Sequence, residues 1–372
     1  MSRYRHSEIE EDGSIGSRFL SDGSETRAEL VQTERGGWGG ISGGQYLDQD
    51  ARIRGQEKYL PDSANRQFGL FTLQTLVRGP LRFEGGLRVE FARLHADEDP
   101  DLPGAGGGSG IGAEPITRRF TSLSGSVGGS YEVAPGWRAG LSLSHSERAP
   151  AIDELFSFGP HGGSQQFIIG DPGLKKESSN SAELSLRRST GPVHVQASLY
   201  YSRFANFIYQ APTGEIADQL PLYEYRQGKA HYYGFEIGAD ARLGQMLGID
   251  WGAELVADAV RATIRGFGPA PLIPPLRLLG AITASRGQVD GRLELERVSA
   301  QRRTAPNETG TPGFNMVNAS VDWHPFAANP ELTLTLEGNN LFDVEARRHS
   351  SVLKDYAPLG GRDIRLSANI RF

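Results

Sequence analysis

The sequence ends in RDIRLSANIRF, residues 362–372, and this stretch alternates between apolar and polar side chains up to its last position. The apolar set is Ile364, Leu366, Ala368, Ile370 and Phe372, and each of them follows a charged or polar residue. Successive side chains of a β-strand point to opposite faces, so the stretch predicts a strand with one apolar and one ionic face. The rest of the chain must show what each face contacts.

The same alternation recurs along the chain, and no long segment has a helical period. We expect about 16 such strands, many of about 10 residues or more, whereas an ordinary strand has about 5 to 6 residues. A strand tilted across a bilayer needs about 9 to 11 residues. The clearest examples are LRFEGGLRVEF (81–91), VHVQASLYY (193–201), FEIGADARL (235–243) and ELTLTLEG (331–338).

The connections between the predicted strands are of two lengths. Short turns are expected at 78–80, 134–136, 190–192, 286–288 and 326–330, and long polar loops at 97–116, 147–176, 209–222, 265–275, 301–313 and 343–361. Antiparallel strands with short turns at one end and long loops at the other are typical of outer-membrane β-barrels. All four tryptophans, Trp38, Trp137, Trp251 and Trp323, lie beside short connections, and indole favours the membrane interface.

The composition restricts the function classes. With a net charge of −6 over 372 residues and no concentrated basic face, the chain gives no sign of nucleic-acid binding. No apolar run approaches the roughly 20 residues of a spanning helix, so a membrane location requires strands. The start, MSRYRHSEIEEDG, has no apolar secretory segment. Because the chain has no cysteine, disulfides and thiolate metal sites are excluded.

A large soluble β-sandwich also alternates along its strands and is the alternative fold. Sandwich strands tend to be shorter, and they give no reason for tryptophans to gather at one end. In addition, Arg82, Glu84, Arg88 and Glu90 share one face of a single predicted strand. A water-filled lumen accommodates such a row of charges, which favours the barrel.

Four segments carry the motifs of one known family: SHSERAPAIDELFSFGPHGGSQQFIIGDPGLKKESSNSAEL (144–184), SLYYSRFANFIY (198–209), YYGFEIGADARL (232–243) and LEGNNLFDVEARRHSSVLKDYAPLGGRDIRLSANIRF (336–372). They resemble the C-terminal barrel of TonB-dependent outer-membrane receptors. The resemblance runs from about Tyr4 to Phe372. Within it, GPH (159–161) and HSSVLKDYAPLGGR (349–362) look most like the branch implicated in uptake of zinc or other metals.

The resemblance implies a transporter and not an enzyme. Such receptors are gated porins, in which a plug domain fills a barrel of about 22 strands and energy arrives through TonB, ExbB and ExbD. No intrinsic cofactor is implied; the metal or metal chelate is cargo. The apolar face of the last strand would contact outer-membrane lipid, and Phe372 looks like the sorting signal that the Bam assembly machinery recognises.

The sequence also departs from the family pattern. It begins at a barrel strand, without signal peptide, TonB box or plug, and about 16 expected strands fall roughly six short of 22. We therefore expect residues 1–372 to form the C-terminal barrel part of a longer receptor, arising as a fragment, a split gene or a misplaced start codon. Unpaired strand edges are not tolerated in lipid, so the two edges must close on each other or remain an open trough.

His161 is the candidate metal ligand. It falls in the longest predicted loop, in FSFGPHGGSQQF, and neutral imidazole suits zinc and similar ions. Counting strands back from Phe372 at the periplasmic side places this loop outside the cell. The alternative is a loop histidine that is hydrogen-bonded to backbone.

Arg148 and Glu154, in ERAPAIDELF, form the second candidate pair. Their opposite charges suit an ion pair that braces the start of the long loop, and direct contact with substrate is the alternative.

The functional hypothesis is an outer-membrane TonB-dependent receptor that imports a scarce nutrient, a metal ion or a metal chelate such as a siderophore, haem or zinc. One rival is an ungated porin-like channel in which about 16 strands close and small solutes diffuse. Another is a surface adhesin, although the loops are mostly polar and an adhesin would expose large apolar patches.

Overall fold

A computed structural model describes residues 1–9, 12–102, 110–326 and 332–370, and nearly all of its regular structure is β. The first strands are β1 (Ser2–Ile9), β2 (Ile15–Arg35), β3 (Trp38–Arg54), β4 (Ser63–Arg78), β5 (Leu81–Ala96), β6 (Ile116–Ala134) and β7 (Trp137–Arg148). A loop region with α1 (Ile152–Phe156), β8 (Phe158–His161), the 3-10 turn η1 (Gly162–Ser164) and β9 (Gln166–Ile169) follows. The remaining strands are β10 (Glu177–Arg188), β11 (Val193–Ala217), β12 (Leu220–Met246), β13 (Ile249–Ile264), β14 (Gly268–Pro269), β15 (Arg277–Arg286), β16 (Val289–Val298), β17 (Phe314–Trp323), β18 (Leu332–Asn339) and β19 (Asp363–Ile370).

The strands form one sheet in which sequence neighbours pair. Antiparallel ladders join β1 through β7 in order, then β7 to β10, and continue through β13 and β15 to β19. The described residues form 16 long strands and three short ones, β8, β9 and β14, which have four residues or fewer and lie in loops. The expected antiparallel order of about 16 strands is therefore confirmed.

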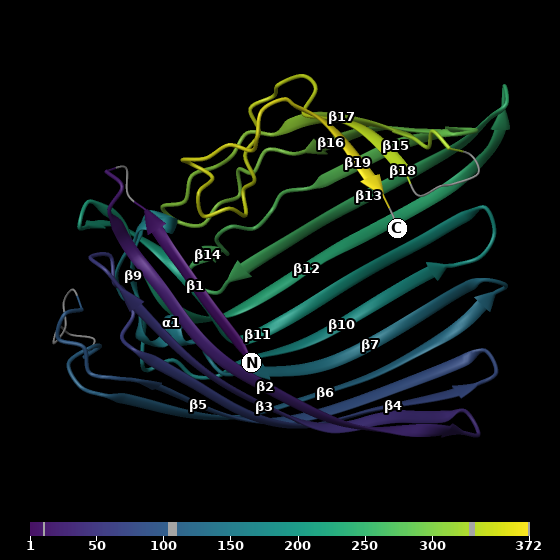
Figure 1. The fold of residues 1–372 in the computed structure, drawn as a ribbon. Coiled ribbons are helices and arrows are strands. Elements are labelled where there is room, and N and C mark those ends of the chain that lie inside the picture. Colours follow the sequence, from purple (N-terminus) through teal and green to yellow (C-terminus); the bar gives the residue numbers. More distant parts are fainter. Residues whose placement is uncertain (10–11, 103–109, 327–331, 371–372) are drawn as a thin grey trace.

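The sheet curls into a deep trough (Figure 1). Among the described residues, β1 has a ladder only with β2, and β19 has one only with β18. Ile53 of β3, Leu94 of β5 and Ile208 of β11 pack in one buried cluster with Leu155 and Phe156 of α1. Because these strands are far apart in the sheet, the residues that meet around α1 must point to the concave face. Side chains of the opposite parity point to the convex face.

The last strand has its apolar side chains on the convex face. Met316 of β17 is buried beneath the loop residue Ala346, on the concave face. Side chains alternate along each strand, and residues paired across strands share a face. Glu337 of β18 and Arg365 of β19 therefore also point to the concave face. Leu366, next to Arg365, points the other way and is 77% exposed. Arg371 and Phe372 lie outside the described residues, so the terminal sorting signal stays a prediction.

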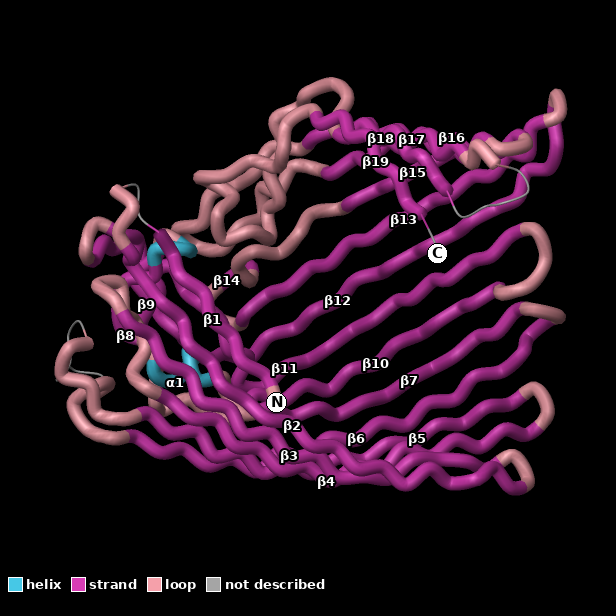
Figure 2. The backbone as a smooth tube through the Cα atoms, viewed as in Figure 1, coloured by secondary structure: helices cyan, strands magenta, loops and turns pink. Residues whose placement is uncertain are grey.

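The two ends of the trough differ, as expected. Figure 2 shows tight turns at one end and long loops at the other. Trp38 and Trp137 are the first residues of β3 and β7, Trp323 is the last of β17, and Trp251 lies two residues into β13, so all four lie near the short-turn end. Of the short turn expected at 326–330, residues 327–330 lie outside the described part of the chain.

One predicted loop is wrong. Residues 209–222 were expected to be a long polar loop because they combine proline, glycine and charged residues. Instead, β11 and β12 continue through this region and join by a two-residue turn. Asp218 and Gln219 have φ values of 47° and 63° in that turn, the left-handed conformation that tight hairpins require. The β11–β12 ladder is interrupted between Pro212 and Ile216, and this irregularity accommodates the residues that do not fit a regular strand.

No helix in the described ranges is both long and apolar enough to cross a membrane.

Candidate binding site

The long-loop end holds a pocket that we call the tyrosine pocket. It has a volume of about 420 Å³, within the range of about 300 to 1,000 Å³ that small-molecule sites occupy. The extended hairpin of β11 and β12 forms one wall, and segments 164–166, 271–272, 307–309 and 352–356 form the others. Its tyrosines are Tyr209, Tyr223, Tyr225, Tyr232 and Tyr356.

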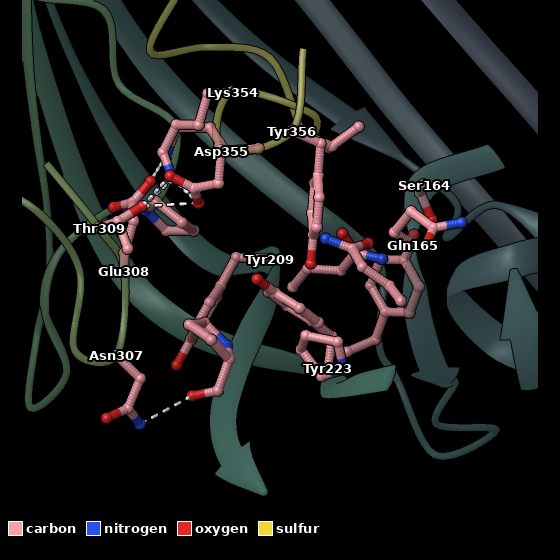
Figure 3. A pocket seen from close by; sticks show the side chains of 18 of the residues that line it. Ser164, Gln165, Tyr209, Tyr223, Asn307, Glu308, Thr309, Lys354, Asp355 and Tyr356 are labelled. Atoms are coloured by element: carbon pink, nitrogen blue, oxygen red, sulfur yellow. Dashed lines mark hydrogen bonds and ion pairs between the residues drawn. The ribbon is translucent and has the colours of Figure 1, made fainter. Parts of the chain in front are cut away.

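Figure 3 shows Tyr209, Tyr223 and Tyr356 around a common space, with Gln165 on one side and Asp355 on the other. Tyr209 packs against Phe267 with ring centroids 4.8 Å apart, which fixes its ring. The pocket is thus walled by aromatic faces and carries amide and hydroxyl groups between them. Such a lining suits an organic ligand with rings or an apolar body.

Three phenols of the pocket wall, those of Tyr209, Tyr223 and Tyr225, keep their protons at neutral pH. Burial raises the pKa of Tyr209 and Tyr223, and burial together with the nearby charge of Asp153 raises the pKa of Tyr225. The Tyr225 hydroxyl donates a hydrogen bond of 3.0 Å to Asp153 Oδ2, which ties the wall to α1. A phenol with a raised pKa keeps its proton and can donate a hydrogen bond, but it is a poor anionic metal ligand.

One corner of the pocket is charged. Lys354 Nζ donates to Thr309 Oγ1 at 2.9 Å and lies 3.4 Å from Asp355 Oδ2. The Thr309 hydroxyl lies 2.7 Å from each Asp355 carboxylate oxygen. Lys354 is 5% exposed, so this cation is neutralised within the corner. The corner therefore presents no free positive charge to a ligand.

Glu308 anchors the loop behind this corner. Its carboxylate accepts bonds of 2.8 Å from the backbone N–H groups of Leu272 and Ala305. His349 Nε2 lies 3.3 Å from Glu308 Oε1, close enough for an ion pair but outside the direction of a good hydrogen bond. Burial raises the pKa of Glu308, but His349 and the two backbone donors lower it by more, so the carboxylate stays ionised. Its role is to hold segments 271–272 and 305–309 together.

The structure brings Arg148 and Glu154 together. Arg148 Nη1 donates to Glu154 Oε2 at 2.8 Å and Nη2 donates to Oε1 at 3.0 Å. Arg148 Nε also donates to Glu177 Oε1 of β10 at 3.1 Å. Glu154 accepts a further bond of 2.7 Å from the backbone N–H of Ala151, which caps α1. Neither residue lines the tyrosine pocket.

His161 lies in the loop region but outside the pocket lining. Its Nδ1 accepts a hydrogen bond of 3.1 Å from the backbone N–H of Ser164, and its ring packs on Tyr59 with centroids 4.5 Å apart. A neutral imidazole has one lone pair for accepting, so the proton must be on Nε2 while this bond exists. Burial lowers the pKa of His161, which keeps the ring neutral. Metal binding by His161 therefore requires this bond to break.

Within the described residues, no three His, Asp or Glu side chains gather in a geometry that could hold a metal ion. The tyrosine pocket itself was not predicted from the sequence. Its residues come from segments that are far apart in the chain. Tyr209 fell in the stretch 209–222 that was interpreted as a loop, and Tyr223 follows directly after it. A signal was present in YEY (223–225), whose alternation continues that of a strand.

Comparisons with known proteins agree with this architecture. The family model described as TonB dependent receptor-like, beta-barrel matches residues 4–341. The copper transporter OprC has a similar fold, with a TM-score of 0.80 at 19% identity over 96% of this chain and 57% of that chain. The FrpB iron transporter from Neisseria meningitidis (F3-3 variant) has a TM-score of 0.69 at 15% identity over 96% of this chain and 55% of that chain.

A Serratia marcescens hemophore receptor, a HasR double mutant in complex with HasA and heme, has a TM-score of 0.67 at 16% identity, over 96% of this chain and 59% of that chain. This chain therefore spans little more than half the length of the structures it matches. At these identities, the likeness is one of fold.

Proposed function

This chain belongs to the family of TonB-dependent receptor β-barrels, and from that premise we propose that it forms the barrel of an outer-membrane receptor that takes up an organic chelate of a metal. Members of this family are transporters and not enzymes. The tyrosine pocket carries the proposal, because it lies where the long loops meet and has the size of a small organic ligand.

The pocket favours a chelate over a bare ion. The phenols of Tyr209 and Tyr223 keep their protons, the one lysine of the pocket is paired, and the described residues hold no cluster of three metal-ligating side chains. A bare divalent ion needs several charged or imidazole ligands in a fixed geometry. A chelate brings its own ligands and offers its organic shell to aromatic walls.

The convex face supports the location. Leu199 of β11, Leu293 of β16 and Leu366 of β19 are about half exposed or more, at 59%, 55% and 77%, and belong to many large apolar side chains that water would not favour. Outer-membrane lipid is the partner that suits such a band. Residues 1–372 would act as one barrel domain, whose energised transport would depend on a plug with a TonB box, on TonB, ExbB and ExbD, and whose insertion would use the Bam machinery.

The experiment replaces two pocket tyrosines. Tyr209→Ala and Tyr223→Ala, alone and together, should weaken binding of a neutral ferric hydroxamate to the purified protein. Each lost aromatic contact contributes about 0.5 to 1.5 kcal/mol, so the double variant should bind about 5- to 150-fold more weakly. Tyr4→Ala, an exposed tyrosine in β1, is the matched control.

Titration with zinc chloride distinguishes a receptor for a metal chelate from a receptor for a bare metal ion. Binding of zinc with an affinity above that of the chelate, unaffected by the pocket variants, would contradict a chelate receptor and favour a bare ion. Failure of the chelate to bind at all would remove the proposed substrate class.

A further inference from the structure

Three arginines stand side by side across neighbouring strands, and we call them the arginine row. Arg66 of β4 is directly opposite Arg93 of β5, and Arg93 is directly opposite Arg119 of β6. Neighbouring strands are about 4.8 Å apart. Like charges directly opposite each other destabilise a sheet, so this arrangement calls for a compensating anion.

The arginine row lies on the convex face. Leu94, next to Arg93 in the chain, is 1% exposed and packs in the cluster around α1 on the concave side. Arg93 therefore points away from the trough, and direct pairing places Arg66 and Arg119 on the same face. The strands β4, β5 and β6 lie next to one another along the bottom of the view (Figure 1).

The side chains of the described residues supply only one carboxylate to the three arginines. Arg66 Nε bonds Asp48 Oδ1 at 3.2 Å, in an ion pair that is about half exposed on the arginine side. In the described part of the chain, neither Arg93 nor Arg119 has a hydrogen-bond or ion-pair partner, and both are exposed. The row thus holds three guanidinium groups and one carboxylate.

The row borders the apolar band of the convex face. Phe68 and Phe91 are each two residues from an arginine of the row, face the same side, and are directly paired with each other. They are 43% and 48% exposed. Arg66 is the fourth residue of β4, which begins at the long-loop end and finishes at Arg78 beside a short turn. The arginine row therefore lies where the hydrocarbon region gives way to headgroups on the long-loop side.

We propose that the arginine row binds the phosphate groups of an anionic lipid in the outer leaflet. Guanidinium groups bind phosphate oxygens in pairs, and one phosphate has enough oxygens to bond two neighbouring arginines. A bound phosphate would also remove the repulsion across the three strands. This inference rests on the proposed outer-membrane location, and it does not depend on the ligand of the tyrosine pocket.

The test uses the full chain in phosphatidylcholine vesicles with or without diphosphoryl lipid A. Simultaneous Arg66→Gln, Arg93→Gln and Arg119→Gln replacement should lower lipid A binding roughly 100-fold, because each arginine near an anionic lipid surface contributes about fivefold. Lysine at the same three positions keeps the charge but loses paired bonding, so it should give an intermediate loss. Arg78→Gln is the matched control, because Arg78 is an exposed arginine on the same face of β4 at the other end.

Equal lipid A binding by the wild type and the triple glutamine protein, with strand content unchanged by circular dichroism, would overturn the proposal. Equal loss in Arg78→Gln would also overturn it, because the effect would then be one of total charge. Displacement of lipid A by millimolar inorganic phosphate would show a site for free phosphate instead. If the full chain binds lipid A but binds no chelate, the proposed substrate class is refuted, and the inference about the arginine row still stands.

Discussion

Arg148 of β7 bonds both oxygens of Glu154 in α1, at 2.8 and 3.0 Å, and reaches Glu177 of β10 with Nε at 3.1 Å. One guanidinium thus joins two neighbouring strands to the loop that begins between them. Of the two roles considered for this pair, bracing the loop and contacting a substrate, the geometry suits the first, because neither residue faces the tyrosine pocket.

We predict that Arg148→Ala loosens residues 149–176. The substitution leaves the largely buried Glu154 and Glu177 without their common cation, which costs about 1 to 3 kcal/mol. The lower part of that range applies, since the Arg148 side chain is 42% exposed and water screens the pair. Hydrogen exchange of the loop amides should rise roughly tenfold. Arg82→Ala removes an exposed pair with Glu84 and should change nothing; equal exchange in both variants would contradict the bracing role.

We predict that Leu366→Arg destabilises the sheet in lipid far more than Ser367→Arg. The two residues are neighbours in β19 but face lipid and lumen respectively. An arginine at the lipid midplane costs about 2 to 4 kcal/mol, whereas one in a wet lumen costs much less. Urea titration of protein folded into phosphatidylcholine vesicles measures both. A larger loss for Ser367→Arg would mean that the faces of this strand are reversed.

We predict that the loop around His161 opens as the pH falls. Burial holds the folded-state pKa of His161 below its ordinary value of 6.5, so the open state takes up a proton first. Stability from this group is therefore complete above about pH 6.5 and is lost as the pH falls below it. Exchange of the Ser164 amide should speed up between pH 7.5 and pH 5.5. His161→Asn, which caps without titrating, should show no such change; a pH effect that survives in this variant would assign it to another group.

Metal capture by His161 stays a prediction, and the structure shows which hydrogen bond the metal would have to break. Nδ1 is occupied by the Ser164 N–H, so zinc must displace that bond. If imidazole is a ligand in the complete receptor, His161→Ala and His161→Asn should both weaken zinc binding and slow zinc-limited growth. If asparagine restores what alanine loses, His161 acts only as a cap.

The strands could be predicted from the sequence because their signal is local. Alternation in LRFEGGLRVEF and in the final residues reports directly which side chains share a face, and the structure repeats it strand by strand. The sequence also predicts which face points inward, because charged residues such as Arg88 and Glu90 belong on the water-exposed side.

The candidate site could not be predicted in the same way. Tyr209 and Lys354 are distant in sequence, and only the closure of loops over the hairpin brings both to one pocket. The hairpin was itself hidden by Pro212 and Gly214, which indicate a loop in isolation but sit at a break in the ladder. His161 shows the converse: its residue type indicated a ligand, while its contact with Ser164 is a local backbone bond that no pattern reveals.

The strict register of the long strands limits how this gene can change length. One codon gained or lost within β5 would turn Phe91 toward the lumen and Arg88 toward lipid, together with every residue beyond the change. Two codons would restore the faces and shift only the pairing. The long loops have no such alternation. Insertions and deletions should therefore accumulate in those parts of the loops that neither pack around α1 nor line the tyrosine pocket, while the strands diverge by substitution.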